Sequence, residues 1–189
     1  MNQTTNEKIT VEKNTVSFFF FDIESVNTDF LEMKKAMTRG HYIKASRIAN
    51  ILLENHNNRR IKLTLTREEA CLCEIARGIF SFRKKDYFTA LSRFGSAWGL
   101  AQSDMRIKCE LLEALVNTYD GNFKEARRKL KEANAAIILK DAMNNNDSVY
   151  ALRYECDSVR KILESKCRGY ADNKRRVKKT SKLFTVAVI

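Results

Sequence analysis

Apolar residues recur along the middle of the chain with the spacing of one face of an α-helix. The same four offsets, 0, 3, 7 and 10, occur three times between residues 42 and 133. The three sets are Tyr42, Ala45, Ala49 and Leu52; Tyr87, Ala90, Phe94 and Ala97; and Phe123, Ala126, Leu130 and Ala133. Because these offsets fall in one stripe along a helix, each set predicts an amphipathic helix with one buried face.

A short polar turn precedes each of these helices. The turns are Gly40-His41, Lys85-Asp86 and Gly121-Asn122. Glycine suits the left-handed conformation in which many helices end, and Asp or Asn suits the N-cap of the helix that follows. We therefore expect one helix to end and another to begin at each of these three places.

The segments before the turns repeat as well. Cys73, Ala76 and Phe80 correspond, 36 residues further on, to Cys109, Leu112 and Val116, and the first copy has Phe30, Met33 and Met37. Gly78 and Ala114 also correspond, and such small residues let two helices approach closely. The unit is therefore helix, turn, helix. One such unit cannot bury its own apolar face, whereas stacked neighbours can.

The order of small residue, turn, aromatic residue and regularly spaced alanines resembles the tetratricopeptide repeat. The second copy reads Gly78, Asp86-Tyr87, Ala90, Phe94 and Ala97; the third reads Ala114, Gly121-Asn122-Phe123, Ala126, Leu130 and Ala133. The resemblance covers roughly residues 28 to 140. It implies an all-α fold, a short right-handed superhelix of antiparallel helix-turn-helix repeats, with a concave groove that holds peptides or partner helices.

Three departures make the chain resemble a degenerate relative of that family as much as a regular member. The period is 36 residues, rather than the family's usual length of about 34. The chain has no proline to close a repeat. Arg77 and Glu113 stand where the family has an apolar residue in its first helix.

The two ends of the chain differ from the repeats. Residues 1–27 form a polar arm whose apolar block, Phe18 to Phe21, we expect to plug the first helices; the repeats occupy residues 28–143. After a break at Asn144 to Ser148, residues 147–167 predict a capping helix. Its expected buried face is Leu152, Cys156, Val159 and Leu163. Residues 168–189 form a basic tail with an apolar end, which we expect to fold back on the array.

The amino-acid composition supports a helical fold and shows where the positive charge lies. The absence of proline and the presence of only six glycines favour helices over a β-sandwich or barrel. The net charge of the chain is +12. The segment from Lys166 to Lys182 has eight Lys or Arg and one acid, Asp172, and therefore carries +7 of that charge. The helical body is therefore only mildly basic, and the attraction for polyanions is concentrated in the tail.

The cysteines and the lack of long apolar runs indicate the cellular compartment of the protein. Five cysteines form no disulfide framework, and Cys71, Cys73 and Cys109 fall among apolar helical residues, where a thiol behaves as a small hydrophobe. This pattern is typical of a reducing compartment, the cytoplasm or alternatively the nucleus. No run reaches the roughly 20 apolar residues of a membrane span, and no secretory leader is recognisable.

The sequence contains no recognisable catalytic constellation. His41 and His56 are expected at the surface, without a nucleophile or a metal partner. The spacing Cys71-x-Cys73 is not a zinc spacing, and no glycine-rich phosphate loop is present. Glu68 and Glu69 are expected on an exposed helix start. We therefore expect a non-enzymatic protein without a cofactor or a metal.

Two surfaces are left as candidates for binding. The first is a polar row on the first helices of the second and third repeats: Glu74, Arg77 and Ser81, followed by Glu110, Glu113 and Asn117. If this row lines the groove, it would hold a partner segment. The alternative is an ordinary solvated helix face, since repeat arrays present faces of both kinds.

The second surface is the basic run of the tail: Lys174, Arg175, Arg176, Lys178 and Lys179. It would hold nucleic acid or another polyanion without sequence preference and with a steep salt dependence, or it is merely solvated chain. The leading hypothesis is a protein-interaction module, adaptor-like, chaperone-like or regulatory; the alternative is a nucleic-acid-associated regulator that uses the tail. An exposed apolar end would also favour self-association into a homo-oligomer.

Overall fold

Every element that the computed structural model describes is an α-helix. The described part comprises Phe19, Phe21 and residues 23–58, 64–143 and 147–186, with side chains described as far as Lys174. Within it are seven helices and no strand. The helices are α2 (Thr28–Thr38), α3 (Tyr42–Asn57), α4 (Arg67–Arg83), α5 (Tyr87–Leu100), α6 (Ser103–Asp120), α7 (Phe123–Met143) and α8 (Asp147–Val186). The prediction of an all-α protein is confirmed.

The three predicted turns join consecutive helices into hairpins. Gly40 and Gly121 adopt positive φ angles of 73° and 84°, the conformation expected of a glycine after a helix. Lys85 adopts φ 63° in the second turn, where no glycine is available. The Asp86 side chain then caps α5 by accepting a hydrogen bond from the backbone N–H of Thr89 at 3.1 Å. Local sequence therefore sets where each hairpin bends.

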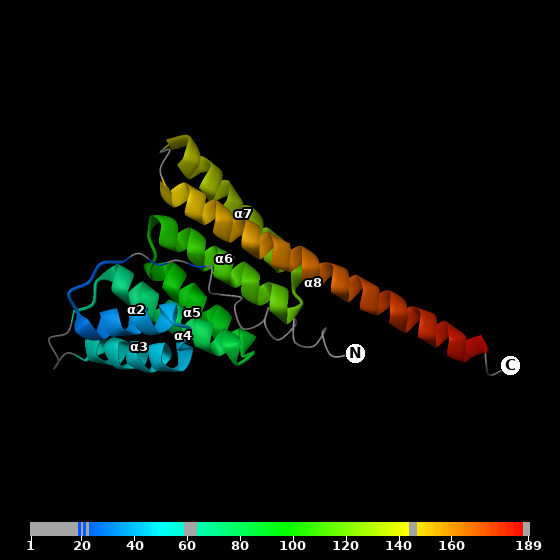
Figure 1. The fold of residues 1–189 in the computed structure, drawn as a ribbon, viewed down its shortest axis with the longest axis horizontal. Helices are drawn as coiled ribbons and strands as arrows, with labels where there is room; N and C mark the ends of the chain where they lie inside the picture. Colours follow the sequence, from blue (N-terminus) through cyan, green and yellow to red (C-terminus); the bar gives the residue numbers. More distant parts are fainter. Residues whose placement is uncertain (1–18, 20, 22, 59–63, 144–146, 187–189) are drawn as a thin grey trace.

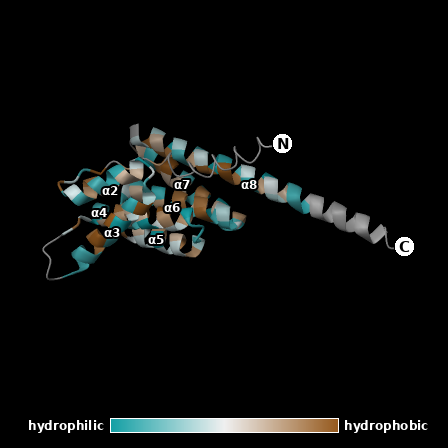
Figure 2. Ribbon diagram, turned by 60° about the horizontal axis from the view of Figure 1, so that its bottom comes forward, coloured by the Kyte–Doolittle hydropathy of each residue, from teal (hydrophilic) through white to brown (hydrophobic). Residues whose placement is uncertain are grey.

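Helices that are consecutive in the chain pack side by side from α2 to α7, and α8 packs against both α6 and α7 (Figure 1). Hydrophobic positions gather within this helical body (Figure 2). The alanine positions of the predicted stripes are buried, and Ala90, Phe94 and Ala97 have no exposed surface. The aromatic residues that open the stripes, Tyr42, Tyr87 and Phe123, are partly buried. The repeats thus bury the faces that their spacing predicted.

The last helix is longer than the predicted capping helix of residues 147–167. It runs 40 residues to Val186 and includes most of the predicted tail. Among its described side chains, Leu163 is the last that is buried, and its far half extends beyond the other helices (Figure 1). Residues 183–186 lie at that far end, so the expected folding back onto the array was wrong for them; residues 187–189 lie outside the described part.

Candidate functional site

The predicted polar row points toward the second helices of the repeats, α5 and α7. On α4, the Glu74 carboxylate lies 3.0 Å from Arg77 and 3.5 Å from Arg93 of α5. Ser81 is half-buried near the end of α4, and its carbonyl accepts a hydrogen bond from the backbone N–H of Asp86 at 3.0 Å. On α4, therefore, the row is part of the packing between the two helices of one hairpin.

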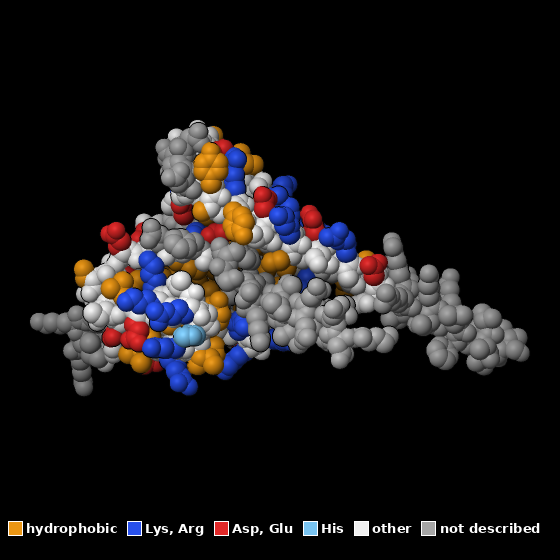
Figure 3. All heavy atoms as spheres, in the orientation of Figure 1, with side chains coloured by type: hydrophobic (Ala, Val, Ile, Leu, Met, Phe, Trp, Pro, Cys, Tyr) orange, Lys and Arg blue, Asp and Glu red, His pale blue; other side chains and the backbone are white. Residues whose placement is uncertain are grey.

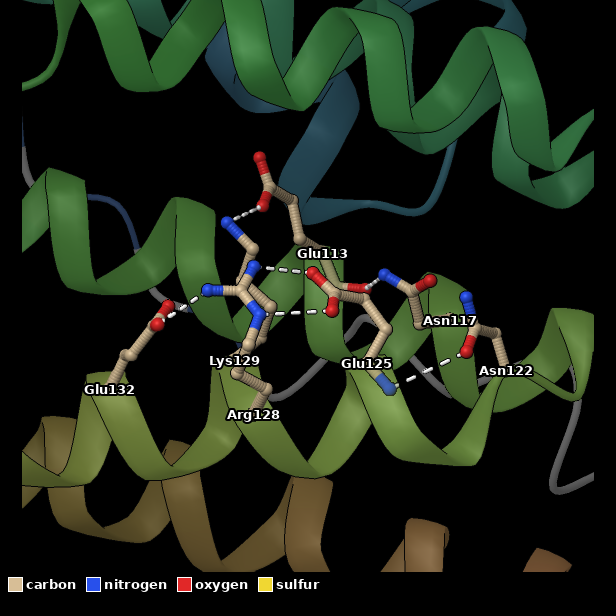
Figure 4. A network of polar contacts seen from close by, with 7 residues as sticks. All are labelled: Glu113, Asn117, Asn122, Glu125, Arg128, Lys129 and Glu132. Carbon is tan, nitrogen blue, oxygen red and sulfur yellow. Dashed lines mark hydrogen bonds and ion pairs between the residues drawn. The ribbon is translucent and has the colours of Figure 1, made fainter.

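On α6 the row is more deeply buried. Glu113 is 8% exposed and pairs with Lys129 of α7 at 2.5 Å. Asn117 is 4% exposed and donates its side-chain N–H to the Glu113 carbonyl at 2.9 Å. Figure 4 shows both residues beside α7, where Arg128 forms ion pairs with Glu125 and Glu132. Glu113 and Asn117 therefore join α6 to α7, and little of either is left for a partner.

Glu110 is the member of the row that borders open space. Its carboxylate accepts a hydrogen bond from the indole N–H of Trp98 at 3.2 Å, and the Arg106 guanidinium lies 4.1 Å from the Trp98 ring centre. Burial raises the pKa of Glu110, against the lowering effect of the Trp98 hydrogen bond. Beside it lies a hollow of about 420 Å³ between α6 and α7 that Met143 also borders.

A second set of residues, which was not predicted to be a binding surface, occupies the opposite side of α4 and α6. Ser25 donates a hydrogen bond to Glu69 near the start of α4, and Phe21 lies over the Lys108 ammonium of α6, 5.4 Å from the ring centre. The segment before α2 therefore runs across the first helices of two successive repeats (Figure 1). We call the described residues 19, 21 and 23–25 the strap.

The strap buries its apolar side chains at alternate positions. Phe19 is 7% exposed and Ile23 is 5% exposed, and both belong to the main core. Phe21 is half-buried and stacks on Phe19, with ring centres 6.4 Å apart and ring planes inclined by 14°. Lys34 of α2 donates to the Ile23 carbonyl at 2.9 Å. The expected plug is thus present at Phe19 and Phe21, whereas Phe18 and Phe20 lie outside the described residues.

A buried ion pair lies beneath the strap. Lys108 of α6 and Glu155 of α8 are 3.0 Å apart, with only 10% and 1% of their side chains exposed. The Lys108 ammonium therefore serves two contacts, the Glu155 carboxylate and the face of Phe21. A cation that is partly desolvated attracts an aromatic ring more strongly than an exposed one. The Lys108 ammonium is therefore placed to attract the ring of Phe21.

Glu69 corrects a prediction about the start of α4. The sequence analysis placed it on an exposed helix start, but it is only 6% exposed. It forms a capping box with Thr66, in which each side chain bonds the other residue's backbone N–H. Its second contact, with Ser25, ties the strap to α4. The motif of Thr, two residues and Glu was visible in the sequence, whereas the contact with Ser25 was not.

The two histidines also differ from each other. His41 is exposed at the start of α3. His56 is half-buried, and its Nδ1 accepts a hydrogen bond from the Leu65 backbone N–H at 3.1 Å. His56 therefore joins α3 to the segment that precedes α4, rather than lying freely at the surface as expected.

The basic run is placed along the far half of α8. Lys174 is exposed, and residues 175, 176, 178 and 179 belong to the same helix, with their side chains outside the described part. Nearer the body, a hollow of about 480 Å³ lies between α7 and α8. It is bordered by three arginines, Arg127, Arg160 and Arg168, and by one acid, Glu164. Among the described residues, basic side chains therefore gather at this hollow.

The cysteines that were predicted to be buried are buried. Cys71, Cys73 and Cys109 have no exposed surface, Cys156 is 1% exposed, and Cys167 is half-buried beside Arg127. Desolvation raises the pKa of Cys73 to about 12 and also raises the pKa of Cys156. Their thiolates, the reactive forms, are therefore scarce at neutral pH.

Thiol labelling should separate the five cysteines into two classes. In the folded chain at pH 7.5, iodoacetamide should modify Cys167 at least tenfold faster than Cys71, Cys73, Cys109 or Cys156. Mass spectrometry of tryptic peptides after timed quenching measures each rate. In 6 M guanidinium chloride all five should react at similar rates. Rapid labelling of Cys73 in the folded chain would contradict the burial described above.

Two kinds of feature are absent from the described residues. No group of three or more His, Cys, Asp or Glu side chains within that part is placed to hold a metal ion. Among the helices described, none is both long enough and apolar enough to cross a membrane. No protein-family model, curated protein or solved structure matches the chain.

Proposed function

We propose that this chain is a non-enzymatic protein-interaction module of degenerate tetratricopeptide-like hairpins. In this proposal, the face formed by α4 and α6 binds a non-helical segment of a partner protein. One observation carries the proposal: a segment of the chain itself, the strap, already lies across this face. The face therefore has the shape and chemistry to hold a segment of this kind.

The contacts of the strap indicate what a partner segment should contain. Apolar side chains at alternate positions would take the places of Phe19, Phe21 and Ile23. An aromatic ring at the middle position would meet the Lys108 ammonium, as Phe21 does at 5.4 Å. Lys34 would donate a hydrogen bond to the backbone carbonyl at the third position, as it does to the Ile23 carbonyl at 2.9 Å. Main-chain contacts give affinity and alternate side-chain pockets give specificity in such recognition.

A partner would have to compete with the strap. A segment held in the same chain has an effective concentration of the order of millimolar, so a separate segment of similar affinity binds poorly until the strap leaves. The strap is continuous with α2 through Val26, whose side chain is fully exposed at 101%. The connection between strap and body is therefore accessible to a protease or to an inserted cleavage site.

The proposal can be tested with the strap sequence as the probe. A chain that begins at Glu24 should bind a fluorescent peptide of residues 14–24 with micromolar affinity by anisotropy, and the full chain should bind it at least 50-fold more weakly. A control peptide with Phe19→Ser and Phe21→Ser should not bind. If the shortened chain keeps its helical circular dichroism yet binds both peptides equally, or neither, the face is not a segment-binding site.

A second variant covers the case in which the shortened chain does not fold. A specific protease site inserted after Val26 allows the full chain to fold first and to be cut afterwards. The cut strap should then exchange with the labelled peptide in hours, and excess unlabelled peptide should slow the uptake of label. If the cut chain unfolds instead of exchanging, the strap is a permanent part of the core and the proposal is wrong.

A further inference from the structure

We infer that the hollow between α7 and α8 is a binding site for a phosphate monoester that has an apolar body, such as an aryl phosphate. The site is separate from the α4–α6 face and does not depend on the function proposed for that face. Its volume is about 480 Å³, and sites for small ligands usually have volumes of roughly 300–1,000 Å³. Both helices contribute side chains to it.

Three guanidinium groups surround this hollow. Arg127 lies on α7, and Arg160 and Arg168 lie on α8. Arg160 pairs with Asp157 at 2.6 Å. Figure 3 shows Lys and Arg side chains gathered along the described part of α8, with a few acids between them. Like charges that lie close together repel one another, so a bound anion would stabilise this arrangement.

The other two arginines have no carboxylate partner within the described part of the chain. Arg127 donates a hydrogen bond to Cys167 Sγ at 3.4 Å, and a thiol is a weak acceptor. Arg168 is exposed and forms no ion pair or hydrogen bond with another described residue. The acid that borders the hollow, Glu164, offsets one of these two charges. The hollow therefore keeps a positive excess, and two guanidinium groups can still bind a ligand.

The floor of the hollow is apolar. Leu130 of α7 and Leu163 of α8 line it and are 7% and 4% exposed, whereas Arg127 and Arg168 are exposed. A bare phosphate ion would leave this floor in contact with water. A ligand with an apolar body would cover it, and planar guanidinium groups also stack on aromatic faces. The expected ligand therefore combines an anionic head with an apolar body, preferably an aromatic one.

The charge and shape of the anionic head favour a phosphate over a carboxylate. A phosphate monoester carries about −1.5 to −2 charges at pH 7 and has three strong acceptor oxygens. A carboxylate carries a single charge and has fewer acceptor oxygens. Arg127 and Arg168 belong to different helices, and each guanidinium can donate two parallel hydrogen bonds to phosphate oxygens. A phosphate head can therefore bind both arginines at once and balance both charges.

Cys167 provides a reporter for the test, because it borders the same hollow and is half-buried, whereas the other four cysteines are buried. A ligand in the hollow should protect Cys167 of the full chain from iodoacetamide at pH 7.5 and constant ionic strength. Phenyl phosphate should halve the labelling rate at about 1 mM, the affinity expected of so small a ligand. Inorganic phosphate, which has no apolar body, and benzoate, which has one charge, should need at least fivefold higher concentrations.

A further arm distinguishes two sources of the same chemistry, a free aryl phosphate and a phosphorylated tyrosine in a protein chain. The probe is a five-residue peptide with phosphotyrosine at its centre and alanine elsewhere. Protection at or below the concentration of phenyl phosphate identifies a site for a phosphorylated chain, and at least fivefold weaker protection identifies a site for the free ester. The peptide without its phosphate should not protect Cys167 at 10 mM.

Two double variants with equal charge loss locate the site. The chain with Arg127→Gln and Arg168→Gln should need at least tenfold more phenyl phosphate for half-protection. The chain with Arg39→Gln and Arg47→Gln, which are exposed on the α2–α3 hairpin, should stay within about twofold of the unchanged chain. Because Arg127 contacts Cys167, the concentrations for half-protection are compared rather than the labelling rates. Circular dichroism checks that both variants fold.

Removing the acid should have the opposite effect. Glu164→Gln takes away the negative charge that borders the hollow, so half-protection should need about two- to threefold less phenyl phosphate. Glu54→Gln, an equal change of charge at an exposed position on α3, should leave the concentration unchanged. The pair therefore separates a local effect on the hollow from an effect of net charge.

Three outcomes would overturn the inference. The first is labelling of Cys167 that 10 mM phenyl phosphate does not slow. The second is an equal loss of protection in both arginine double variants, which would show that net charge alone is responsible. The third is protection by inorganic phosphate or benzoate at the same concentration as phenyl phosphate, which would exclude a site that needs both the double charge and the apolar body.

Discussion

Replacing Lys108 with Met should lower the free energy of unfolding by about 3–5 kcal/mol. The substitution keeps the apolar stem of the side chain but removes the ammonium that lies 3.0 Å from the Glu155 carboxylate. Glu155 is 1% exposed and would keep a buried charge without this counterion. The cost arises from that carboxylate, because a buried charge that loses the ammonium beside it is far less stable than the same charge in water.

A double variant separates this cause from the loss of packing. The chain with both Lys108→Met and Glu155→Leu should recover most of the lost stability, because two apolar side chains often replace a buried ion pair at little cost. Urea denaturation followed by circular dichroism measures the free energy of unfolding of both variants and of a control. As a control, Lys44→Met breaks the Lys44–Glu32 pair, whose side chains are 57% and 53% exposed. That change should cost less than about 1 kcal/mol.

The measurement also bears on the proposed binding face. Lys108→Met removes the cation over which Phe21 lies at 5.4 Å. If Lys108→Met cost no more than Lys44→Met, the Lys108–Glu155 pair would be unimportant for folding. The presence of the Lys108 ammonium beneath the strap would then have to be explained by the proposed binding of a partner segment alone.

The hairpins could be predicted from the sequence because their signals are local. Gly40 and Gly121 adopt the left-handed conformation that their position after a helix suggests. The stripe at Ala90, Phe94 and Ala97 is buried, as its spacing indicates. Backbone geometry and helical period both act within a few residues, so a single sequence contains enough information for these elements.

The candidate site could not be predicted in the same way, because its partners are far apart in the sequence. Glu113 was assigned to an open groove, yet Lys129 of the next helix covers it. Lys108 and Glu155 are 47 residues apart. Each stands beside a buried cysteine, and a charged residue in such a place was the available signal. Periodicity identifies a helix face but does not say which neighbour it will meet.

The end of α8 was missed for a different reason. Residues 168–186 lack an apolar stripe, and the predicted helix was therefore ended at residue 167. The structure continues the helix to Val186 although its far half is not packed against the body. The apolar pattern indicates which part of a helix is buried, but it does not indicate how long the helix is.

Replacing Phe94 with Ala should cost about 3–5 kcal/mol of unfolding free energy, because its buried ring fills the contact between α5 and α4. The cause of this tight contact is Gly78. A Cβ atom built at Gly78 would lie 2.4 Å from Cε1 of Phe94, much closer than two carbons can approach. Gly78→Ala should therefore destabilise the chain by about 1–3 kcal/mol, even though alanine favours a helix over glycine by about 1 kcal/mol.

The two substitutions should compensate each other. In the Phe94→Ala chain the ring is gone, so Gly78→Ala should become stabilising by about 1 kcal/mol, through its helix propensity and through partial filling of the cavity. The control is Gly99→Ala on α5, where a Cβ would meet nothing within 4 Å, and which should stabilise either background equally. Urea denaturation of the four chains of the cycle gives the coupling energy. If Gly78→Ala has the same effect with and without the ring, α4 and α5 do not approach as closely as described.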